Sequence, residues 1–233
     1  MQSLGQSFNA LVIGATGGIG GAFLEQLEAH GNCQYVARLD RANFEGFDLR
    51  TESSIIETSN HFQNEGALFD LIIDATGALE IDGKRPERAF AEIDPANMAA
   101  HFAINAIGTA LIIKHFAPLM RPGERSVFAT LGARVGSIED NKLGGWVSYR
   151  AAKAAKNQIV RTASIEIQRK QKQHICVALH PGTVATRLSE NYNTPSEKFT
   201  PLIAAKKLLS VIDGLVPNDS GYQFAYDGSR VQS

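Results

Sequence analysis

Short apolar runs alternate along the chain with longer segments in which apolar residues recur every three or four positions. Runs such as Leu11 to Ile13 predict buried β-strands, and segments such as the one containing Ile19, Phe23 and Leu27 predict amphipathic helices. We expect strands near residues 11–13, 33–37, 68–74, 126–131, 174–180 and 222–226. We expect the later helices near residues 53–62, 95–119, 147–172 and 201–215.

This alternation predicts an α/β fold with a doubly wound parallel sheet of about seven strands flanked by helices. The 233 residues suit a single domain over residues 1–233, because no repeat, low-complexity tract or linker interrupts the pattern. A hydrophobic content of 44% is typical of a globular protein with a sizeable core.

A glycine-rich turn separates the first strand from the first helix. Gly14, Gly18 and Gly20 have the spacing G-x-x-x-G-x-G. In a dinucleotide-binding Rossmann fold such glycines form the sharp turn, admit a pyrophosphate and let helix and strand pack closely. The helix N-terminus then offers N–H groups to a phosphate. The alternative is a flexible loop, but the position favours a cofactor site that also includes Thr16 and Ile19.

The end of the second strand bears on which dinucleotide binds. An acidic residue there binds the ribose of NAD, whereas a basic residue accommodates the phosphate of NADP. The predicted strand runs into Ala37 and Arg38, and Asp40 is expected to lie further into the loop. The sequence therefore favours NADP(H), with NAD(H) possible, although Arg38 could equally be a solvated loop arginine.

Two later turns add candidate cofactor contacts. Asp48 and Leu49 precede the second helix, and Asp48 either faces the adenine ring or is an ordinary loop aspartate. Ala75, Thr76 and Gly77 end the third strand with backbone that can approach a ligand closely. All five are predicted to contact the cofactor.

The long helix near residues 95–119 begins with Asp94 as N-cap and proline at its first position. Its apolar surface is broad enough to pack against a partner subunit as well as the sheet. Asn105 and Gly108 lie in its middle, where a buried asparagine is unfavourable unless it has a specific hydrogen-bonding role.

Tyr149 and Lys153 are four residues apart near the start of a predicted helix, so they share one helix face. A free tyrosine has a pKa of about 10, and a neighbouring ammonium group lowers it. Tyr149 could then give a proton to, or take one from, an oxygen at the carbon that exchanges hydride. A chance pairing is the alternative, but the glycine turn upstream favours catalysis.

The chain resembles the short-chain dehydrogenase/reductase family over essentially its full length, and within it the C-factor-like branch related to small carbonyl reductases. The resemblance implies NAD(P)(H) binding and a small carbonyl or alcohol substrate. It implies that Tyr149 is the acid/base, that Lys153 holds the nicotinamide ribose, and that Asn105 takes part in a water-linked proton relay. The motifs are Gly14-x-x-x-Gly18-x-Gly20, Asp74-Ala-Thr-Gly77, Asn105-Ala-Ile-Gly, Tyr149-x-x-x-Lys153 and Pro181-Gly182-Thr183, and the resemblance places Pro181, Gly182, Thr183 and the following Val184 at the nicotinamide.

One position departs from the family pattern. The family has a catalytic serine three residues before Gly136, and Ala133 occupies that place here, preceded by Gly132. Ser137 and Ser148 are the nearby candidates to replace it, although Ser137 could equally be a loop serine bonded to backbone. Losing one such donor could cost a few kcal/mol of transition-state stabilisation.

The composition excludes several other classes of protein. A net charge of −1 argues against nucleic-acid or membrane-surface partners, and no metal site is expected. We also expect no apolar stretch near the length of a membrane span. Cys33 and Cys176 are far apart in the sequence, and the sequence shows no recognisable secretion signal. We therefore expect reduced, buried thiols and a cytoplasmic location.

Two hypotheses of function follow. The first is an NADP(H)-dependent oxidoreductase for a carbonyl/alcohol pair, and the second is an NAD(P)-binding signalling or regulatory protein with weak or vestigial catalysis. The family resemblance also implies a homodimer or homotetramer formed through the helix from Pro95 and the helix of Tyr149. We expect the substrate to be selected by residues 79–91, 138–146 and 187–200, with Leu143, Trp146 and Tyr192 in an apolar wall.

Overall fold

The computed structural model describes residues 1–190, 192 and 198–232, and these residues contain one seven-stranded sheet. The strand order is β2-β1-β3-β4-β5-β6-β7, and neighbouring strands are parallel except for the last pair. β2 lies on one side of β1 and the later strands lie on the other, so the strand order reverses at β1. In folds of this kind ligands bind outside the carboxyl ends of the strands at such a point. The strands are β1 (Phe8–Ile13), β2 (Cys33–Leu39), β3 (Leu71–Asp74), β4 (Val127–Leu131), β5 (Ile175–His180), β6 (Gln223–Ala225) and β7 (Arg230–Val231).

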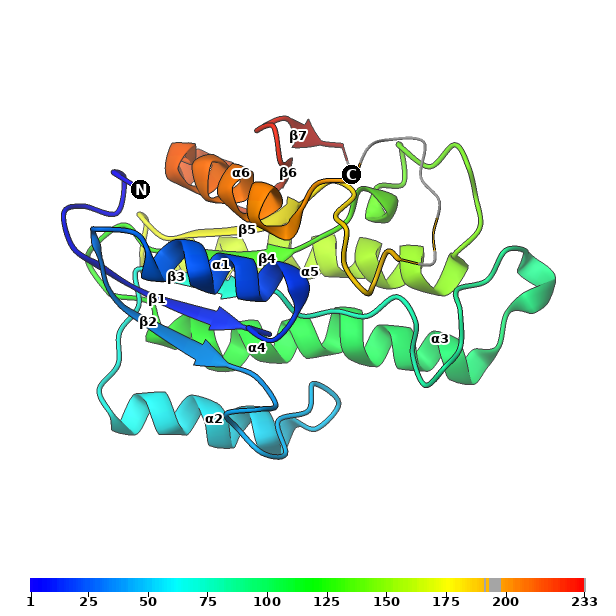
Figure 1. Ribbon diagram of the computed structural model, residues 1–233, viewed down its shortest axis with the longest axis horizontal. Helices are drawn as coiled ribbons and strands as arrows, with labels where there is room; N and C mark the ends of the chain where they lie inside the picture. Colours follow the sequence, from blue (N-terminus) through cyan, green and yellow to red (C-terminus); the bar gives the residue numbers. More distant parts are fainter. Residues whose placement is uncertain (191, 193–197, 233) are drawn as a thin grey trace.

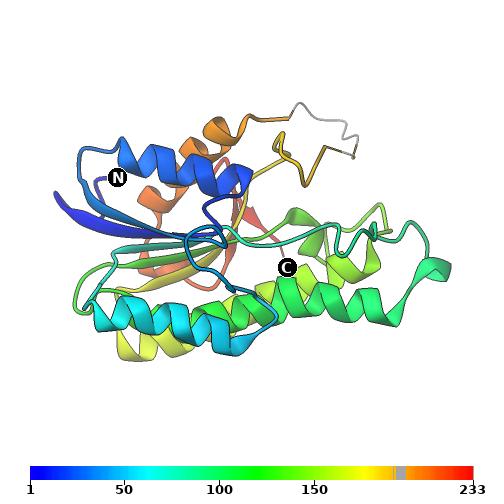
Figure 2. The ribbon, with the colours of Figure 1, turned by 60° about the horizontal axis from the view of Figure 1, so that its bottom comes forward.

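Helices cover both faces of the sheet, as Figures 1 and 2 show. α1 and α6 lie on one face, where Phe23 and Leu208 pack with Val12 in one apolar cluster. α2, α4 and α5 lie on the other, where Phe62 and Phe116 belong to a second cluster. The six α-helices among the described residues are α1 (Gly18–Glu28), α2 (Glu52–Asn64), α3 (Pro95–Phe102), α4 (Gly108–Phe116), α5 (Val147–Lys170) and α6 (Pro201–Gly214).

The predicted α/β fold is confirmed, with two corrections in the sheet. β2 continues to Leu39 instead of ending at Ala37, because it pairs with β1 as far as Ile13 and the N–H of Gly14 donates to the Leu39 carbonyl at 2.7 Å. The sheet is also not wholly parallel. A short β7 pairs antiparallel with β6, through Gln223 opposite Val231.

The predicted helix near residues 95–119 is present, but its hydrogen bonding changes in the middle. α3 leads into a π-helical turn over Ala103–Ile107, followed by α4 and a 3₁₀ turn over Ala117–Leu119. Asn105 lies at the centre of the π turn. Such wide turns inside α-helices are frequently found at functional sites.

The same stretch corrects our expectation about apolar length. Pro95–Leu119 has 25 residues and a window of mean hydropathy 1.4, so by length and composition alone it could cross a membrane. In the structure Ile112 and Phe116 of this stretch are completely buried in the cluster beneath the sheet. Packing in the core therefore accounts for part of its apolar character, since 44% of the window is buried.

Candidate active site and cofactor-binding site

The glycine turn after β1 is too tight to hold side chains at its key positions. Gly14 has a φ of +84°, and a Cβ there would lie 3.1 Å from Cγ2 of Thr76. A Cβ on Gly20 would lie 2.1 Å from the carbonyl oxygen of Gly14, so α1 packs directly against the turn. No side chain caps the start of α1, because its N-cap residue is Gly17. Uncapped N–H groups beside a glycine-rich turn fit the pyrophosphate of a dinucleotide.

The start of α1 also touches the segment that follows β5. A Cβ on Gly18 would lie 2.7 Å from Cγ2 of Thr186, so a side chain there would require Thr186 to shift. Thr16 is exposed in the turn, and the half-buried Ile19 packs against the apolar cluster of its own face. Sequence reasoning did not single out Thr186, which lies three residues beyond the predicted Thr183.

Phe199 and Tyr226 hold the segment after β5 in place. The N–H of Phe199 donates to the Thr183 carbonyl at 2.8 Å, and its carbonyl accepts from Ala185 at 2.8 Å. Gly182 has a φ of +75°, and a Cβ there would lie 2.9 Å from the Tyr226 ring. The four predicted residues of this segment are Pro181, Gly182 and Thr183, which are half-buried, and Val184, which is buried.

The end of β2 differs from the prediction. Asp40 follows the strand directly and is 2% exposed. Its carboxylate accepts hydrogen bonds from the Arg38 guanidinium at 3.1 and 3.2 Å and from the N–H of Ala42 at 2.8 Å. The expectation that Asp40 lies further into the loop is therefore wrong. An acidic and a basic residue share this strand end, and each neutralises the other.

Asp48 and Leu49 lie in the turn before α2. Asp48 accepts a hydrogen bond from the N–H of Arg50 at 2.9 Å, and its side chain is half-exposed. A Cβ on Gly108 would lie 3.0 Å from Cβ of Leu49, so the glycine near the start of α4 lets this turn approach the helix. The structure thus shows a turn-stabilising role for Asp48 and a packing role for Leu49.

The turn after β3 connects the glycine turn to the predicted catalytic residues. A Cβ on Gly14 would lie 3.3 Å from the Ala75 carbonyl as well as 3.1 Å from Cγ2 of Thr76. Gly77 has a φ of +146°, and a Cβ there would lie 3.1 Å from Oδ1 of Asn105 and 3.3 Å from Nζ of Lys153. The absence of a side chain at Gly77 therefore allows three chain segments to converge at one point.

Backbone hydrogen bonds fix the side chain of Asn105. Its Oδ1 accepts from the N–H of Ala78 at 3.1 Å, and its Nδ2 donates to the Ala78 carbonyl at 2.9 Å. Nδ2 also lies 3.4 Å from Nδ1 of His101. The predicted need for a specific hydrogen-bonding role is met by this pairing, which ties the π turn to the turn after β3.

Tyr149 and Lys153 lie on one face of α5, as their spacing predicts. Nζ of Lys153 is 5.6 Å from the centroid of the Tyr149 ring and donates to the Leu131 carbonyl at 3.1 Å. Burial raises the pKa of Tyr149. Burial, followed by the charge of Lys156, lowers the pKa of Lys153 well below its ordinary value. A protonated Lys153 would favour the phenolate of Tyr149.

Three buried polar residues near this pair were missed by sequence reasoning. Lys156, three residues after Lys153, donates to Thr130 and Leu131 at 3.1 Å. The ring of His101, four residues before Asn105, lies 5.9 Å from the Tyr149 ring. Helical spacing could have indicated these two, but nothing in the sequence distinguishes Glu87 from its solvated neighbours.

Glu87 is 3% exposed, although its neighbours Arg88, Ala89 and Phe90 are exposed. Its carboxylate accepts hydrogen bonds from the hydroxyl and, at 3.2 Å, the N–H of Ser148. Its own carbonyl accepts from the N–H of Trp146 at 2.6 Å. Burial alone would raise the pKa of Glu87, but these hydrogen bonds lower it below the ordinary value. Glu87 thus caps α5 one residue before Tyr149.

The two serines considered as replacements for the family's catalytic serine already have partners. The Ser148 hydroxyl donates to Glu87. Ser137 is 2% exposed, and its hydroxyl accepts from the N–H of Asp140 at 3.0 Å, as in a loop serine bonded to backbone. Ala133 has extended backbone just before the 3₁₀ turn Arg134–Gly136. The described contacts therefore do not show either serine serving a substrate.

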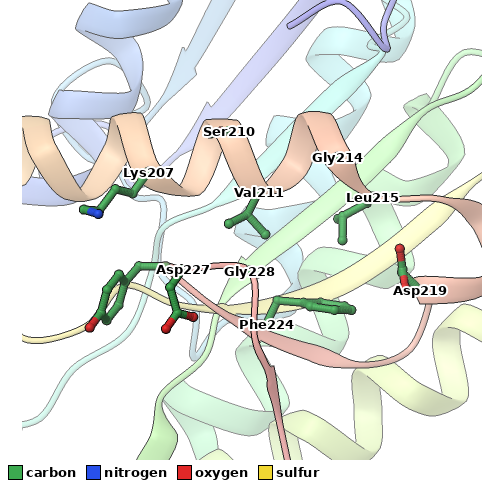
Figure 3. Close-up of a pocket in the computed structure, with 10 residues that line it drawn as sticks. Lys207, Ser210, Val211, Gly214, Leu215, Asp219, Phe224, Asp227 and Gly228 are labelled. Carbon is green, nitrogen blue, oxygen red and sulfur yellow. The ribbon is translucent and has the colours of Figure 1, made fainter.

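A separate open pocket of about 510 Å³ lies between α6 and the β6–β7 turn. Figure 3 shows Val211 of α6 and Leu215, which directly follows α6, facing Phe224, with Asp219 and Asp227 beside them. None of the predicted site residues lines this pocket. It is therefore distinct from the convergence of segments around Gly77.

Comparisons with known proteins agree with the motifs and the fold. The chain is 35% identical over 143 residues to C-signal of Myxococcus xanthus, covering 61% of this chain and 82% of the relative. It is 29% identical over 232 residues to 1-hydroxy-2-glutathionyl-2-methyl-3-butene dehydrogenase of a Rhodococcus species, covering 95% and 98%.

Solved structures with the same fold include NADPH-bound carbonyl reductase from chicken fatty liver, with a TM-score of 0.85, 22% identity and coverage of 98% and 95%. Carbonyl reductase Sniffer of D. melanogaster gives a TM-score of 0.82 at 17% identity, covering 97% and 100%. Residues 9–197 match the family model described as short chain dehydrogenase. This chain belongs to the short-chain dehydrogenase family.

Proposed function

We propose that this chain is an NADP(H)-dependent oxidoreductase that interconverts a carbonyl and an alcohol on a small substrate. The observation that carries the proposal is the convergence of Lys153 and Asn105 at Gly77, with the Tyr149 ring beside Lys153, next to a glycine turn that fits a dinucleotide. A chain that used this fold only to bind a nucleotide would not need all three side chains.

The roles of the residues follow from their chemistry. A bound nicotinamide cofactor donates or accepts hydride in this class of reaction. Tyr149 donates its phenolic proton to the carbonyl oxygen during reduction and removes it from the hydroxyl during oxidation. Because burial raises the pKa of Tyr149, this step depends on a positive charge nearby, and Lys153 supplies it when protonated. Asn105 supports the turn at Gly77 through Ala78.

A preference for NADP(H) rests on Arg38. Its half-exposed guanidinium lies at the end of β2, where a basic residue accommodates the extra phosphate of NADP. NADPH-bound carbonyl reductase shares the fold, which agrees with this assignment. Asp40 argues against this preference for two reasons. Its carboxylate accepts a hydrogen bond from the Arg38 guanidinium, and it lies where an acidic residue would bind the ribose of NAD. A direct comparison of the two cofactors therefore decides this part of the proposal.

Aromatic side chains support a small, apolar substrate. The Trp146 ring lies 6.2 Å from the Tyr149 ring and 5.1 Å from the Tyr192 ring, so three aromatic rings adjoin one another. Leu143 was also predicted to belong to the apolar wall of the substrate site, but it is 92% exposed and does not pack with these rings. Of the predicted specificity segment 187–200, residues 191 and 193–197 lie outside the described part of the chain.

The test is a reductase screen of aldehydes and ketones with NADPH and NADH in parallel, following loss of the reduced cofactor. We expect turnover of at least one apolar carbonyl compound, with a lower KM for NADPH. Cofactor binding without turnover of any compound, in both the natural chain and Ala133→Ser, would count against the enzyme. Equal or better use of NADH would remove the preference for NADP(H) alone.

A second candidate is an NAD(P)-binding signalling protein in which catalysis is weak. Two observations favour it: similarity to C-signal, and the lack of a hydroxyl at Gly132 and Ala133. In that case cofactor binding would remain and turnover would be absent. The screen above distinguishes the two functions.

A further inference from the structure

α5 carries a second buried lysine beside Lys153. The Lys156 side chain is 1% exposed, and its Nζ donates to Oγ1 of Thr130 and to the Leu131 carbonyl, both at 3.1 Å. Lys153 donates to the same carbonyl, also at 3.1 Å. The two nitrogens are therefore at most twice 3.1 Å apart, inside the protein.

A single carboxylate faces this pair. Oδ2 of Asp74 lies 3.8 Å from Nζ of Lys156 and accepts a hydrogen bond from Thr130 at 2.6 Å. Its Oδ1 accepts from the N–H of Thr76 at 3.0 Å. Asp74 is completely buried, so the cluster holds one negative charge for two amines. Two ammonium groups would leave an unbalanced positive charge in a region of low polarity.

The contacts distinguish the two lysines. Lys156 forms the ion pair with Asp74, whereas the contacts described for Lys153 are the Leu131 carbonyl and the Tyr149 ring. Burial and then the Lys156 charge lower the pKa of Lys153, and Asp74 only partly opposes them. Burial also lowers the pKa of Lys156, but there Asp74 is the first opposing influence.

The other polar groups near the pair do not change this charge balance. Asn105, on the π turn, and the phenol of Tyr149, on α5, are neutral side chains. His101 of α3 is completely buried, and burial lowers its pKa, which favours the neutral imidazole. Among the described residues, Asp74 thus remains the only carboxylate that forms an ion pair with either lysine, and its partner is Lys156.

We propose that Lys156, held by Asp74, is a positioning residue that makes Lys153 give up its proton more readily than an ordinary lysine in the free protein. Lys153 therefore holds the positive charge that supports Tyr149 over a narrower pH range than an ordinary lysine would. The effect of Lys153 on Tyr149 rests on the proposed function. The easier loss of the Lys153 proton in the free protein rests only on the contacts of Lys153, Lys156 and Asp74. Lys156 thereby sets the pH range over which Lys153 can support Tyr149.

The experiment titrates the full chain labelled with ¹³Cε-lysine, followed by NMR without cofactor. A Lys153→Met variant serves to assign the Lys153 signal, which disappears from its spectrum. We expect Lys153 to lose its proton at least about one pH unit below the ordinary lysine value near 10.4. A Lys153 signal that titrates at the ordinary value in the natural chain would overturn the proposal without any further variant.

Three variants test the role of Lys156. Lys156→Met should raise the titration midpoint of Lys153, and Asp74→Asn should lower it. The double variant Asp74→Asn/Lys156→Met should remain above the natural chain, because the Lys156 charge acts on Lys153 more strongly than Asp74 does. The double variant removes both charges together and leaves no buried ion unpaired. It therefore keeps the test available if a single variant does not fold. An unchanged Lys153 midpoint in the folded double variant would refute the role of Lys156.

Lys170→Met is the matched control, because Lys170 ends the same helix and its side chain is 76% exposed. It should leave the Lys153 midpoint unchanged, and a shift of similar size there would refute a specific effect of Lys156. A low Lys153 midpoint in a chain that reduces no carbonyl compound would support the inference while the proposed function failed. The two claims are therefore tested separately.

Discussion

The buried cap on α5 provides a sharp test of how the site is held. Replacing Glu87 by Gln keeps the size and an acceptor oxygen for Ser148 but removes the negative charge. Hydrogen bonds to charged groups stabilise proteins by about 1.5–3 kcal/mol each, against about 0.5–1.5 kcal/mol for neutral ones. With two such bonds weakened, we expect Glu87→Gln to lower the free energy of unfolding by about 2 kcal/mol. For a chain of this length that lowers Tm by about 4–8 °C.

The loss should depend on pH in a defined direction. The pKa of Glu87 is lower in the folded chain than its ordinary value of about 4.3, so the charge stabilises the fold fully above that value. The stabilisation disappears as the pH falls through the lower folded pKa. The difference between the natural chain and Glu87→Gln should therefore be constant from pH 8 to pH 5 and shrink below about pH 4.

Urea unfolding followed by circular dichroism at pH 7, 5 and 3.5 measures this difference. Glu166→Gln is the matched control, because Glu166 lies on the same helix with its side chain 70% exposed, and it should leave the midpoint unchanged. An identical stability of Glu87→Gln and the natural chain at pH 7 would refute the capping role. A difference that stays the same down to pH 3.5 would show that the charge is not its source.

Three further predictions concern function and assembly. Tyr149→Phe should lower turnover by about 10²-fold or more while cofactor binding is retained, and unaltered turnover would falsify the mechanism; Ala133→Ser should leave turnover unchanged or raise it. Arg38→Ala should weaken NADPH binding about tenfold relative to NADH binding in fluorescence titrations, because one charged hydrogen bond is lost. Asp40→Asn should strengthen NADPH binding. Equal losses for both cofactors in Arg38→Ala would contradict the role of Arg38. Light scattering should show a dimer or tetramer that Ile107→Arg shifts toward monomer, since Ile107 is 54% exposed on the apolar helix, and a monomeric natural chain would argue against assembly.

Periodicity and glycine spacing were sufficient to predict the fold. Both are local signals: an apolar strand, a turn that admits only glycine, and a helix face that carries Tyr149 and Lys153. The structure agrees with each of these, and Gly14 and Gly20 meet as the G-x-x-x-G-x-G spacing requires. The predicted site lies where these turns converge.

What the sequence could not predict depends on contacts between distant segments. Glu87 caps a helix that begins 60 residues later, so its local sequence looks like a solvated charge cluster. The predicted position of Asp40 was wrong because the pairing of β2 with β1 determines where β2 ends. Lys156 also looks like a surface residue until Asp74 of β3 is placed against it.

The antiparallel β7 has a consequence for how the chain behaves in concentrated solution. An open sheet exposes unpaired N–H and C=O groups along its outer strands, which are templates for pairing with another copy. At one margin the two-residue β7 covers β6 and leaves little strand available for pairing. At the opposite margin the Asn43 side chain donates to the Arg38 carbonyl at 2.6 Å and accepts from the N–H of Asp40 at 2.7 Å. The short β7 and the Asn43 side chain therefore reduce the number of backbone groups that another copy could pair with at these two places.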